Sequence, residues 1–408
     1  MHNLNQKTIC IIKEKYKTSK YKKNPTGYFY DLKKVLENIE LLKINLPKQI
    51  NLFYAMKANN NKEIMSLITS NDYVCGLEIA SYGELKQALK YCTSDEIIFT
   101  GPGKTEYELS ESIKNRIKYI NVESITEAIR INNIAKKLDI DCVDILVRIN
   151  LNYSINDAKE KMSGISTKMG IDEKDCIESI KYINKLERIH IKGIHVFAAS
   201  GVLDYKSLLK SNKYIFDLTQ KIEKIQPIDT IDFGGGLGID YTNQNRKFNI
   251  EKYGEELTNL IKKYSFEDKK IIMELGTYLV GNCGYYTSKI IDIKEVKKRK
   301  HIVLAGGVNH MGLPLEMRRK HPVTIIKMNE EKIYDKVPYI QNEKADISGP
   351  LCMVSDKLAW NTYVKEAYIG DILVFFQSGA YCEGEGMKDF LSHFYPNVEV
   401  INREVQNG

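Results

Sequence analysis

The sequence of 408 residues has no long hydrophobic run. No stretch approaches the roughly 18 consecutive apolar residues that a membrane-spanning helix needs, so we expect no membrane association. The N-terminal stretch MHNLNQKTICIIKEKYK holds an apolar run that is too short for a secretory leader. Disordered, collagen-like and coiled-coil chains are also excluded, because 43% hydrophobic and 28% charged residues are ordinary for a folded globular protein.

Paired cysteines are missing as well. The chain has eight cysteines, but none of them forms a CxxC pair or shows the spacing of metal ligands. This pattern predicts neither a disulfide framework nor a metal site, and it favours a reducing cytoplasm. Cys75 and Cys142 lie in apolar runs, where a reduced thiol acts as a small hydrophobic side chain.

The sequence also lacks a strong excess of charge of one sign. With 60 basic and 53 acidic residues the net charge is +7, and the lysines are spread along the chain. The basic run at 13–23 (KEKYKTSKYKK) is accompanied by no nucleic-acid-binding motif. We therefore interpret it as a solvated segment and expect no nucleic-acid partner.

What the sequence does contain is a regular alternation of two patterns. Eight short β-rich runs recur, and segments with helical spacing lie between them. This alternation predicts a (β/α)8 barrel, a fold that takes roughly 250 residues. We interpret the long gap at 151–188 as a functional loop after the fifth strand, followed by a helix. The eight runs are residues 50–57, 73–80, 96–101, 119–124, 143–150, 189–197, 230–236 and 270–276.

The alternation stops after Gly276. The runs YTSKIIDIKEV, HIVLAGGV, PVTIIKM, DISGPLC and DILVFFQSG follow without long helices between them, which predicts a second, mostly antiparallel β domain. The N-terminal runs TICIIKEK and GYFYDL are also predicted strands, and we expect them to join that domain. The expected segments are 1–28 for the N-terminal strand part of the β domain, 29–278 for the barrel and 279–408 for the rest of the β domain.

In such a barrel the chemistry is expected where the strands end. The first run ends in Lys57, a candidate Schiff-base former, although a lysine that simply reaches solvent at the rim is the alternative. The seventh ends in Gly234, Gly235 and Gly236, whose N–H groups can approach a phosphate closely. The eighth ends in Glu274, which needs a partner such as a protonated ring nitrogen or an arginine. A lysine, a phosphate turn and a carboxylate at one barrel mouth are what pyridoxal phosphate requires.

Ordered motifs extend this pattern from about residue 26 to about residue 395. They are YAMKANNN, EIASYGEL, TGPGKTEYEL, NVES, TKMGID, GIHVFAASG, FGGGLGIDY, ELGTYLVG, LAGGVNH, SGPLC and SGAY. With them the chain resembles the fold-type III pyridoxal-phosphate decarboxylases, the superfamily of diaminopimelate, ornithine and arginine decarboxylases that shares its barrel with alanine racemase. The resemblance implies pyridoxal 5′-phosphate as cofactor and a homodimer with active sites at the interface.

The resemblance also implies a role for each matching residue. Lys57 would bond to the aldehyde of the cofactor, and Glu274 would face its pyridine nitrogen. Cys352 of a second copy would protonate the substrate after carbon dioxide leaves, whereas a buried core thiol is the alternative for this residue. Arg148 would steady the region of the ring hydroxyl through a network. The other cofactor-binding positions are Phe197, Ser200, Gly234, Gly235, Gly236, Gly276, Thr277 and Tyr381.

Four places depart from the family pattern. Phe197 stands where the family stacks a histidine on the cofactor, and Thr277 stands where it has an arginine near the phosphate. Met353 follows the cysteine, where ornithine-type enzymes carry Asp and diaminopimelate-type enzymes carry Glu to meet a distal ammonium. Residues 313–317 (LPLEM) lack the arginine and tyrosine that grip the distal carboxylate of diaminopimelate. These departures disfavour free diaminopimelate, lysine and ornithine as substrates.

Four stretches, GPLC, HPV, FFQSGAY and FLSH, are similar to those of decarboxylases from secondary-metabolite pathways. One such decarboxylase is the butirosin-type enzyme, which acts on glutamate held by a carrier protein. We therefore expect decarboxylation of a citryl- or carrier-protein-linked amino acid in siderophore or related biosynthesis. Asn309, Arg318 and Met353 are expected to contact the substrate, although a solvated basic helix face is the alternative for residues 318–320. Alternative functions are decarboxylation of a free amino acid, racemisation, and cofactor carriage without turnover.

Overall fold

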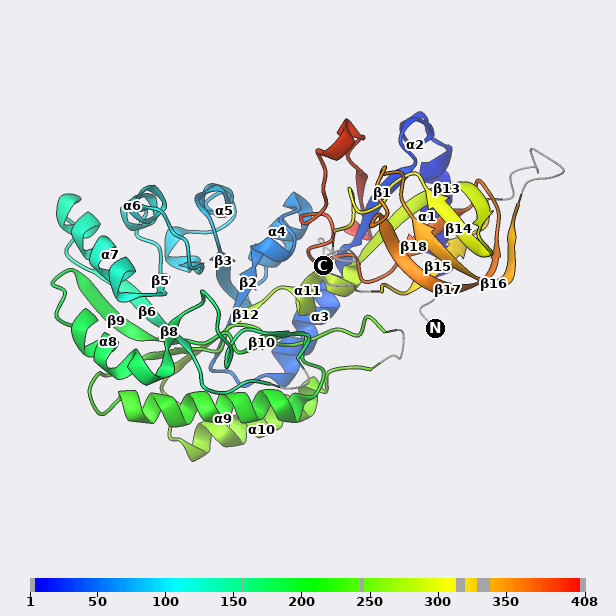
Figure 1. Ribbon diagram of the computed structural model, residues 1–408. Helices are drawn as coiled ribbons and strands as arrows, with labels where there is room; N and C mark the ends of the chain where they lie inside the picture. Colours follow the sequence, from blue (N-terminus) through cyan, green and yellow to red (C-terminus); the bar gives the residue numbers. More distant parts are fainter. Residues whose placement is uncertain (1–3, 156–157, 243–245, 313–319, 329–337, 404–408) are drawn as a thin grey trace. The chain divides into compact units, whose positions relative to one another are not determined.

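The computed structural model describes residues 4–155, 158–242, 246–312, 320–328 and 338–403 (Figure 1). The chain divides into two compact units. The barrel unit comprises Leu36–Ile239 and Lys247–Leu279, and the β unit comprises the described residues of Met1–Val35, Asp240–Arg246 and Val280–Gly408.

The barrel unit holds a closed ring of parallel strands. Its order is β5-β4-β3-β2-β12-β11-β9-β6, and a pairing between β5 and β6 closes it. The eight predicted strands are thereby confirmed, as is the barrel. The strands are β2 (Ile50–Ala55), β3 (Val74–Ile79), β4 (Ile97–Phe99), β5 (Tyr119–Val122), β6 (Val143–Asn150), β9 (Ile189–His195), β11 (Thr230–Asp232) and β12 (Lys270–Leu275).

One helix, α3, precedes the first strand of the ring, and the others lie between successive strands on its outside, where α9 and α10 lie side by side (Figure 1). Their starts follow from side-chain caps, because Asn61, Ser81, Ser124 and Asp204 each accept a hydrogen bond from a backbone N–H of the first turn. The helices are α3 (Leu32–Asn45), α4 (Lys62–Thr69), α5 (Tyr82–Ala88), α6 (Glu106–Lys114), α7 (Ile125–Lys137), α8 (Cys176–Ile183), α9 (Tyr205–Ile222) and α10 (Ile250–Lys263).

The interior of the ring is filled with side chains. One buried cluster draws a residue from each of five strands, namely Phe53, Ile98, Tyr119, Leu146 and Ile272. A barrel interior of this kind is a packed core and not a channel. The carboxyl ends of the strands are therefore separated from their amino ends.

The segment predicted as a long loop and helix contains short pieces of strand. β7 (Glu160–Lys161) pairs with β10 (Ala199–Ser200), and β8 (Ile171–Asp172) pairs in parallel with the last two residues of β6. The predicted helix is α8. The described residues between β6 and α8 are thus bonded to the strand ends.

The β unit contains a mixed but mostly antiparallel sheet, as predicted. Its order is β15-β18-β13-β14-β16-β17, with β1 paired to β13 and β19 paired to β1. Two pairings, β14–β16 and β1–β19, are parallel. The strands are β1 (Thr26–Asp31), β13 (Gly284–Val296), β14 (Arg299–Leu304), β15 (Val323–Ile326), β16 (Ile340–Ser348), β17 (Lys357–Ala367), β18 (Ile372–Phe375) and β19 (Asn397–Ile401).

One predicted strand is wrong. The run TICIIKEK forms part of helix α1 (Gln6–Lys17), which Asn5 caps. Thr8, Ile12 and Tyr16 are its buried residues, and their spacing of four places them on one helix face. In so short an apolar run, hydrophobic periodicity alone does not distinguish a strand from a helix. The other N-terminal prediction, GYFYDL, is confirmed as β1. No helix within the described ranges is long and apolar enough to cross a membrane.

Candidate active site

Lys57 lies directly after β2, in the short 3-10 turn Met56–Ala58. Its Nζ donates to both carboxylate oxygens of Glu78, at 2.9 and 3.0 Å. Glu78 lies on the neighbouring strand β3 and is fully buried, whereas the side chain of Lys57 is 37% exposed. Burial raises the pKa of Glu78 to about 7, although the ammonium of Lys57 opposes that rise. The amine of Lys57 is therefore held in place at the strand end and remains accessible.

Glu274 lies near the end of β12 and is 3% exposed. Thr100 Oγ1 and Asn121 Nδ2 each donate to its Oε1 at 3.3 Å. Nε2 of His195 lies 3.3 Å from its Oε2. Burial alone would raise the pKa of Glu274, but His195 and then the charge of Lys57 outweigh burial and lower it to about 2. Polar side chains from several strand ends thus hold an ionised carboxylate.

Asp232, at the end of β11, is a second buried acid beside Glu274. The potential metal-binding atoms of His195, Asp232 and Glu274 lie within 4.8 Å of one another. Burial and the charge of Glu274 raise the pKa of Asp232 well above its ordinary value. Its Oδ1 accepts the N–H of Gly234 at 2.8 Å. Of the two acids, Glu274 therefore carries the charge, and its backbone N–H donates to the carbonyl oxygen of Gly234 at 2.8 Å, which joins it to the glycine turn.

The glycine turn after β11 depends on the absence of side chains. Gly234 and Gly236 have φ values of +60° and +130°, which other residues rarely adopt. A Cβ atom on Gly234 would lie 2.4 Å from Cδ2 of Phe197, and one on Gly235 would lie 3.0 Å from its Cε2. The phenyl ring of Phe197, which follows β9, therefore packs directly against this turn.

Three further predicted residues lie near these strand ends. Ser200 belongs to β10, so it is bonded through its backbone to the loop segment β7. Gly276 follows β12, and a Cβ atom there would lie 2.8 Å from Cβ of Ala58 in the Lys57 turn. Thr277 begins the short helix α11 (Thr277–Val280). Gly276 thus allows the end of β12 to approach the lysine closely.

Arg148, on β6, lies in a buried network. Its Nη1 donates to Oε1 of Glu123 at 2.6 Å, and Oε2 of Glu123 accepts the N–H of Gly170 at 2.6 Å. Lys104, also buried, donates to the carbonyl oxygen of Asn121 at 2.7 Å. The network therefore links the strand ends to the loop that follows β6.

The other predicted catalytic residue, Cys352, belongs to the β unit. It is exposed, in the loop between β16 and β17, and Met353 beside it is half-buried. The loop is shaped by Asp356, whose Oδ1 accepts the N–H of Val308 at 2.8 Å and whose Oδ2 accepts that of Leu351 at 2.7 Å. Both carboxylate oxygens of this buried acid are thus used for backbone hydrogen bonds.

Three further predicted residues also belong to the β unit. Asn309 is fully buried, and its Oδ1 accepts the N–H of Gly307 at 2.9 Å. Tyr381 is half-buried and has a φ of +63°, a left-handed conformation that is uncommon for tyrosine. Arg318 lies in residues 313–319, outside the described residues.

Sequence reasoning missed several residues of the barrel site. They share one signal, which is a polar side chain at the carboxyl end of a strand that is otherwise apolar. Apolar periodicity identifies the strand, but it does not show which of its polar residues turn inward. The missed residues are Glu78, Thr100, Asn121, Glu123, His195 and Asp232.

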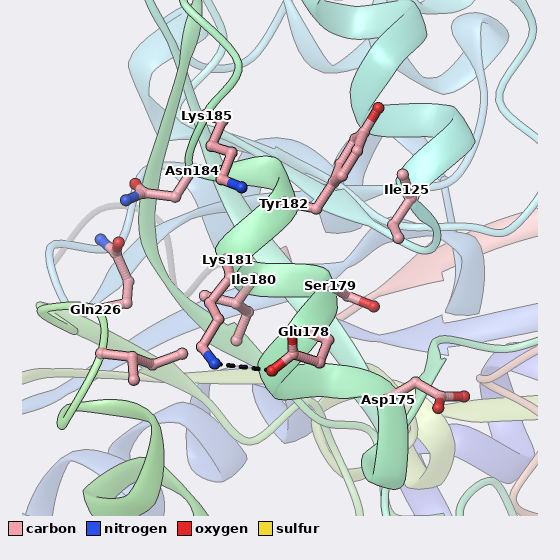
Figure 2. Close-up of a pocket in the computed structure, with 11 residues that line it drawn as sticks. Ile125, Asp175, Glu178, Ser179, Ile180, Lys181, Tyr182, Asn184, Lys185 and Gln226 are labelled. Atoms are coloured by element: carbon pink, nitrogen blue, oxygen red, sulfur yellow. Dashed lines mark hydrogen bonds and ion pairs between the residues drawn. The ribbon is translucent and has the colours of Figure 1, made fainter.

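A large cavity elsewhere on the barrel unit is separate from this site. Its volume is about 680 Å³, and it lies along α8 near Ile125 of α7 and Gln226 (Figure 2). Figure 2 shows Glu178 and Lys181 of α8 paired across one helical turn. None of the residues that line it belongs to the strand-end site, and we assign it no role.

The barrel site fits pyridoxal phosphate. Lys57 supplies an accessible amine for the aldehyde, and ionised Glu274 supplies a partner for a ring-nitrogen cation. Three buried atoms beside Glu274, namely Oδ1 of Asn121, Nδ1 of His195 and Oδ2 of Asp232, have no hydrogen-bond partner among the described residues. Polar capacity therefore remains for a bound polar group.

Comparisons with known proteins give the same assignment. Residues 32–281 match the family model for the pyridoxal-binding domain of pyridoxal-dependent decarboxylases. The chain is 31% identical over 371 residues to 2-[(L-alanin-3-ylcarbamoyl)methyl]-2-hydroxybutanedioate decarboxylase of Staphylococcus aureus, which covers 90% of this chain and 92% of that protein. It is 28% identical to the L-glutamyl-[BtrI acyl-carrier protein] decarboxylase of Niallia circulans, over 98% of this chain and 92% of that protein.

A solved structure extends the likeness to three dimensions. Diaminopimelate decarboxylase of M. jannaschii in complex with L-lysine matches with a TM-score of 0.81 and 26% identity, over 94% of this chain and 89% of that one. The protein therefore belongs to the fold-type III pyridoxal-dependent decarboxylases, and it is a carboxy-lyase that uses pyridoxal 5′-phosphate.

Proposed function

We propose that this enzyme decarboxylates an amino acid whose side chain is already joined to a larger group, such as a citrate-derived amide or a carrier protein. The observation that carries this proposal is the lack of an available carboxylate in the loop after Cys352. Met353 has none, and both oxygens of Asp356 are bonded to the backbone. A free distal ammonium buried there would have no counter-ion, at a cost of several kcal/mol.

The named relatives support this choice. The S. aureus protein acts on an alanine unit whose side chain is linked through an amide to a citrate-like acid, and the N. circulans protein acts on a glutamyl group carried by a protein. In both names the amino acid is part of a larger conjugate, and neither name describes a free diamino acid. A neutral Met353 is compatible with such a linkage.

Pyridoxal phosphate supplies the electron sink that stabilises the carbanion left by carbon dioxide. Lys57 would hold the cofactor's aldehyde before and after turnover, with Glu78 keeping the amine oriented. Glu274 would keep the ring nitrogen protonated, and His195 would hold that carboxylate. The N–H groups of the turn that contains Gly235, with Ser200, Gly276, Thr277 and Tyr381, would bind the phosphate, while Phe197 would lie against the ring and Arg148 near its hydroxyl.

Cys352 would protonate the substrate carbon, acting from a second copy of the chain in a homodimer. Cys352 is exposed in the β16–β17 loop. This exposure is compatible with that role, because the thiol would have to reach a substrate bound to another copy of the chain. Asn309 and Arg318 would contact the substrate. Cys352→Ala is expected to lower product formation by on the order of 100- to 10,000-fold while the cofactor still binds. An unchanged rate would remove the cysteine from the mechanism.

The test of the substrate class is a mass-spectrometric assay of the purified enzyme with three kinds of substrate. These are a citrate-derived amide of 2,3-diaminopropionate, a glutamyl carrier protein, and free diaminopimelate, lysine or ornithine. We expect loss of carbon dioxide from a conjugate and little or none from the free amino acids. Efficient turnover of a free diamino acid would contradict the proposal, and inversion without carbon dioxide would favour a racemase.

A variant sharpens the test. Met353→Glu places a carboxylate beside Cys352, so kcat/KM for a free diamino acid is expected to rise on the order of 10- to 100-fold, the range of a hydrogen bond to a charged group. Met353→Gln has nearly the same size without the charge and serves as its control. Equal effects of the two variants would show that charge at this position does not set specificity.

A further inference from the structure

Three side chains with different ligand chemistry meet at the amino ends of two barrel strands. Cys142 immediately precedes β6, Asp144 is two residues further along, and His190 is the second residue of β9. Asp144 and His190 are directly paired in the parallel register of these strands. Side chains two residues apart on a strand share a face, so the cysteine lies on the same side as this pair.

The distances suit a small metal ion. One potential ligand atom from each residue lies within 4.8 Å of the other two, and Nδ1 of His190 is 3.1 Å from Oδ1 of Asp144. Around a tetrahedral ion with bonds of about 2.0 Å to nitrogen and oxygen, neighbouring ligands are about 3.3 Å apart. The imidazole and carboxylate therefore already have the required separation, and the thiol lies within 4.8 Å of both ligand atoms.

The site is open to solvent. Cys142 and His190 are exposed and Asp144 is half-buried, so the interpretation of Cys142 as a small hydrophobic side chain within an apolar run is wrong. A cavity of about 340 Å³ is lined in part by Cys142 and Asp144. Nζ of Lys192 lies 3.9 Å from the other oxygen of Asp144 and is a competing cation. An ion can thus enter, against the ammonium of Lys192 and two further cationic side chains that line this cavity, Arg116 and Lys118.

We propose that Cys142, Asp144 and His190 form a binding site for a zinc-class divalent ion, with water in the fourth position. A thiolate and an imidazole select zinc over magnesium or calcium, which prefer all-oxygen sites. Binding displaces the thiol proton into solvent and joins β6 to β9 at the end of the barrel opposite Lys57. The site is not part of the decarboxylase machinery, and sequence spacing does not reveal it because its ligands come from two separate strands.

The test uses the full-length enzyme loaded with pyridoxal phosphate. The protein is equilibrated with Zn²⁺, passed through a desalting column and analysed for metal by atomic emission, and Co²⁺ is added in parallel to read the visible bands of a tetrahedral thiolate site. We expect one retained Zn²⁺ per chain, tetrahedral Co²⁺ bands and a higher Tm with metal.

Variants make the result specific. Cys142→Ser and His190→Ala are each expected to weaken binding by more than about 10-fold, since even changes outside the ligand set cost 10- to 100-fold. Lys192→Ala is expected to tighten binding, because it removes a competing cation. Cys10→Ser, at another exposed cysteine, serves as the matched control and is expected to change nothing.

Two results would overturn the proposal. One is failure of the wild type to retain zinc. The other is loss of the Co²⁺ bands in a Cys352→Ser variant with their retention in Cys142→Ser, which would place the metal at the exposed cysteine of the β unit. Metal retention, the Co²⁺ bands and Tm are measured without turnover, so failure of the proposed function does not affect this test. Decarboxylase activity is expected to be the same in the wild type and Cys142→Ser.

Discussion

The two ends of the same barrel strands differ in how their polar residues are used. Strand β12 runs from Lys270, which is exposed, to Glu274, which is 3% exposed and bonded to side chains from three other strand ends. Strand β6 runs from the open neighbourhood of Asp144 to the buried Arg148. The carboxyl ends therefore form one connected, desolvated network, whereas the amino ends carry solvated charges. A substitution of the same size should have a large effect at one end and a small effect at the other.

The largest effect is expected at Lys57. Lys57→Ala removes the amine that would hold the cofactor aldehyde, so carbon dioxide release should fall by several orders of magnitude. A radiometric carbon dioxide assay on a conjugated substrate measures this. Lys62→Ala, on the helix that follows, is the matched control, and a comparable loss there would contradict a specific role for Lys57.

Glu274→Gln is the next largest change. It keeps the shape and one acceptor oxygen for Thr100 and Asn121, but it replaces the oxygen that faces His195 with an amide NH2 and removes the negative charge, so the ring nitrogen would lose its counter-ion. We expect kcat to fall on the order of 100- to 1,000-fold, the range for losing one preorganised electrostatic contact. Stopped-flow and steady-state assays separate kcat from KM. Activity within a few fold of the wild type would mean that the Glu274 charge does not stabilise the reacting cofactor.

A pH-dependent stability effect is expected at Glu78. Its carboxyl group has a reference pKa of 4.5 and a pKa of about 7 in the folded protein, so the folded state binds the proton more tightly than the unfolded state. Stability is therefore lost as pH rises from 4.5 towards 7, by up to about 3 kcal/mol. Glu78→Gln lacks this titration, so the variant should gain stability relative to the wild type between pH 5 and pH 8.

Thermal unfolding of the cofactor-free wild type and Glu78→Gln at pH 5 and at pH 8 checks this stability difference. Glu14→Gln, at an exposed glutamate, is the matched control for the substitution itself. A stability difference that is the same at the two pH values would show that Glu78 does not titrate in this range.

The smallest effect is expected at the amino end of β12. Lys270→Ala removes an exposed charge on the strand that carries Glu274, so kcat/KM should stay within about twofold and stability within about 0.5 kcal/mol. The same assays measure both quantities. A large loss of activity would break the distinction between the two ends of the barrel.

The barrel was predictable from sequence because its eight strands are short apolar runs separated by capped helices. The sequence also predicted Lys57, Glu274 and the glycine turn as site residues, since each ends such a run. The hydrogen-bond partners of Glu274 were not, because Thr100, Asn121 and His195 come from strands far apart in the chain and meet only when the ring closes.

The errors also have physical reasons. Residues 8–15 were predicted as a strand because a short apolar run fits both a strand and the buried face of a helix, and α1 is amphipathic. Cys142 was interpreted as a small hydrophobic side chain because it adjoins an apolar run, yet it is exposed just before β6, at the amino end of that strand. Local pattern identifies an element, but the end of the barrel at which a residue lies decides its exposure.

The most direct test of the account is to find where the cofactor bonds to the chain. Borohydride reduction of the protein loaded with pyridoxal phosphate makes that bond permanent, and peptide mass spectrometry then locates the added pyridoxyl group. If Lys57 bonds to the cofactor, we expect one modified peptide, which contains Lys57 in the sequence YAMKANNN. Modification of a different lysine, or of none, would contradict it.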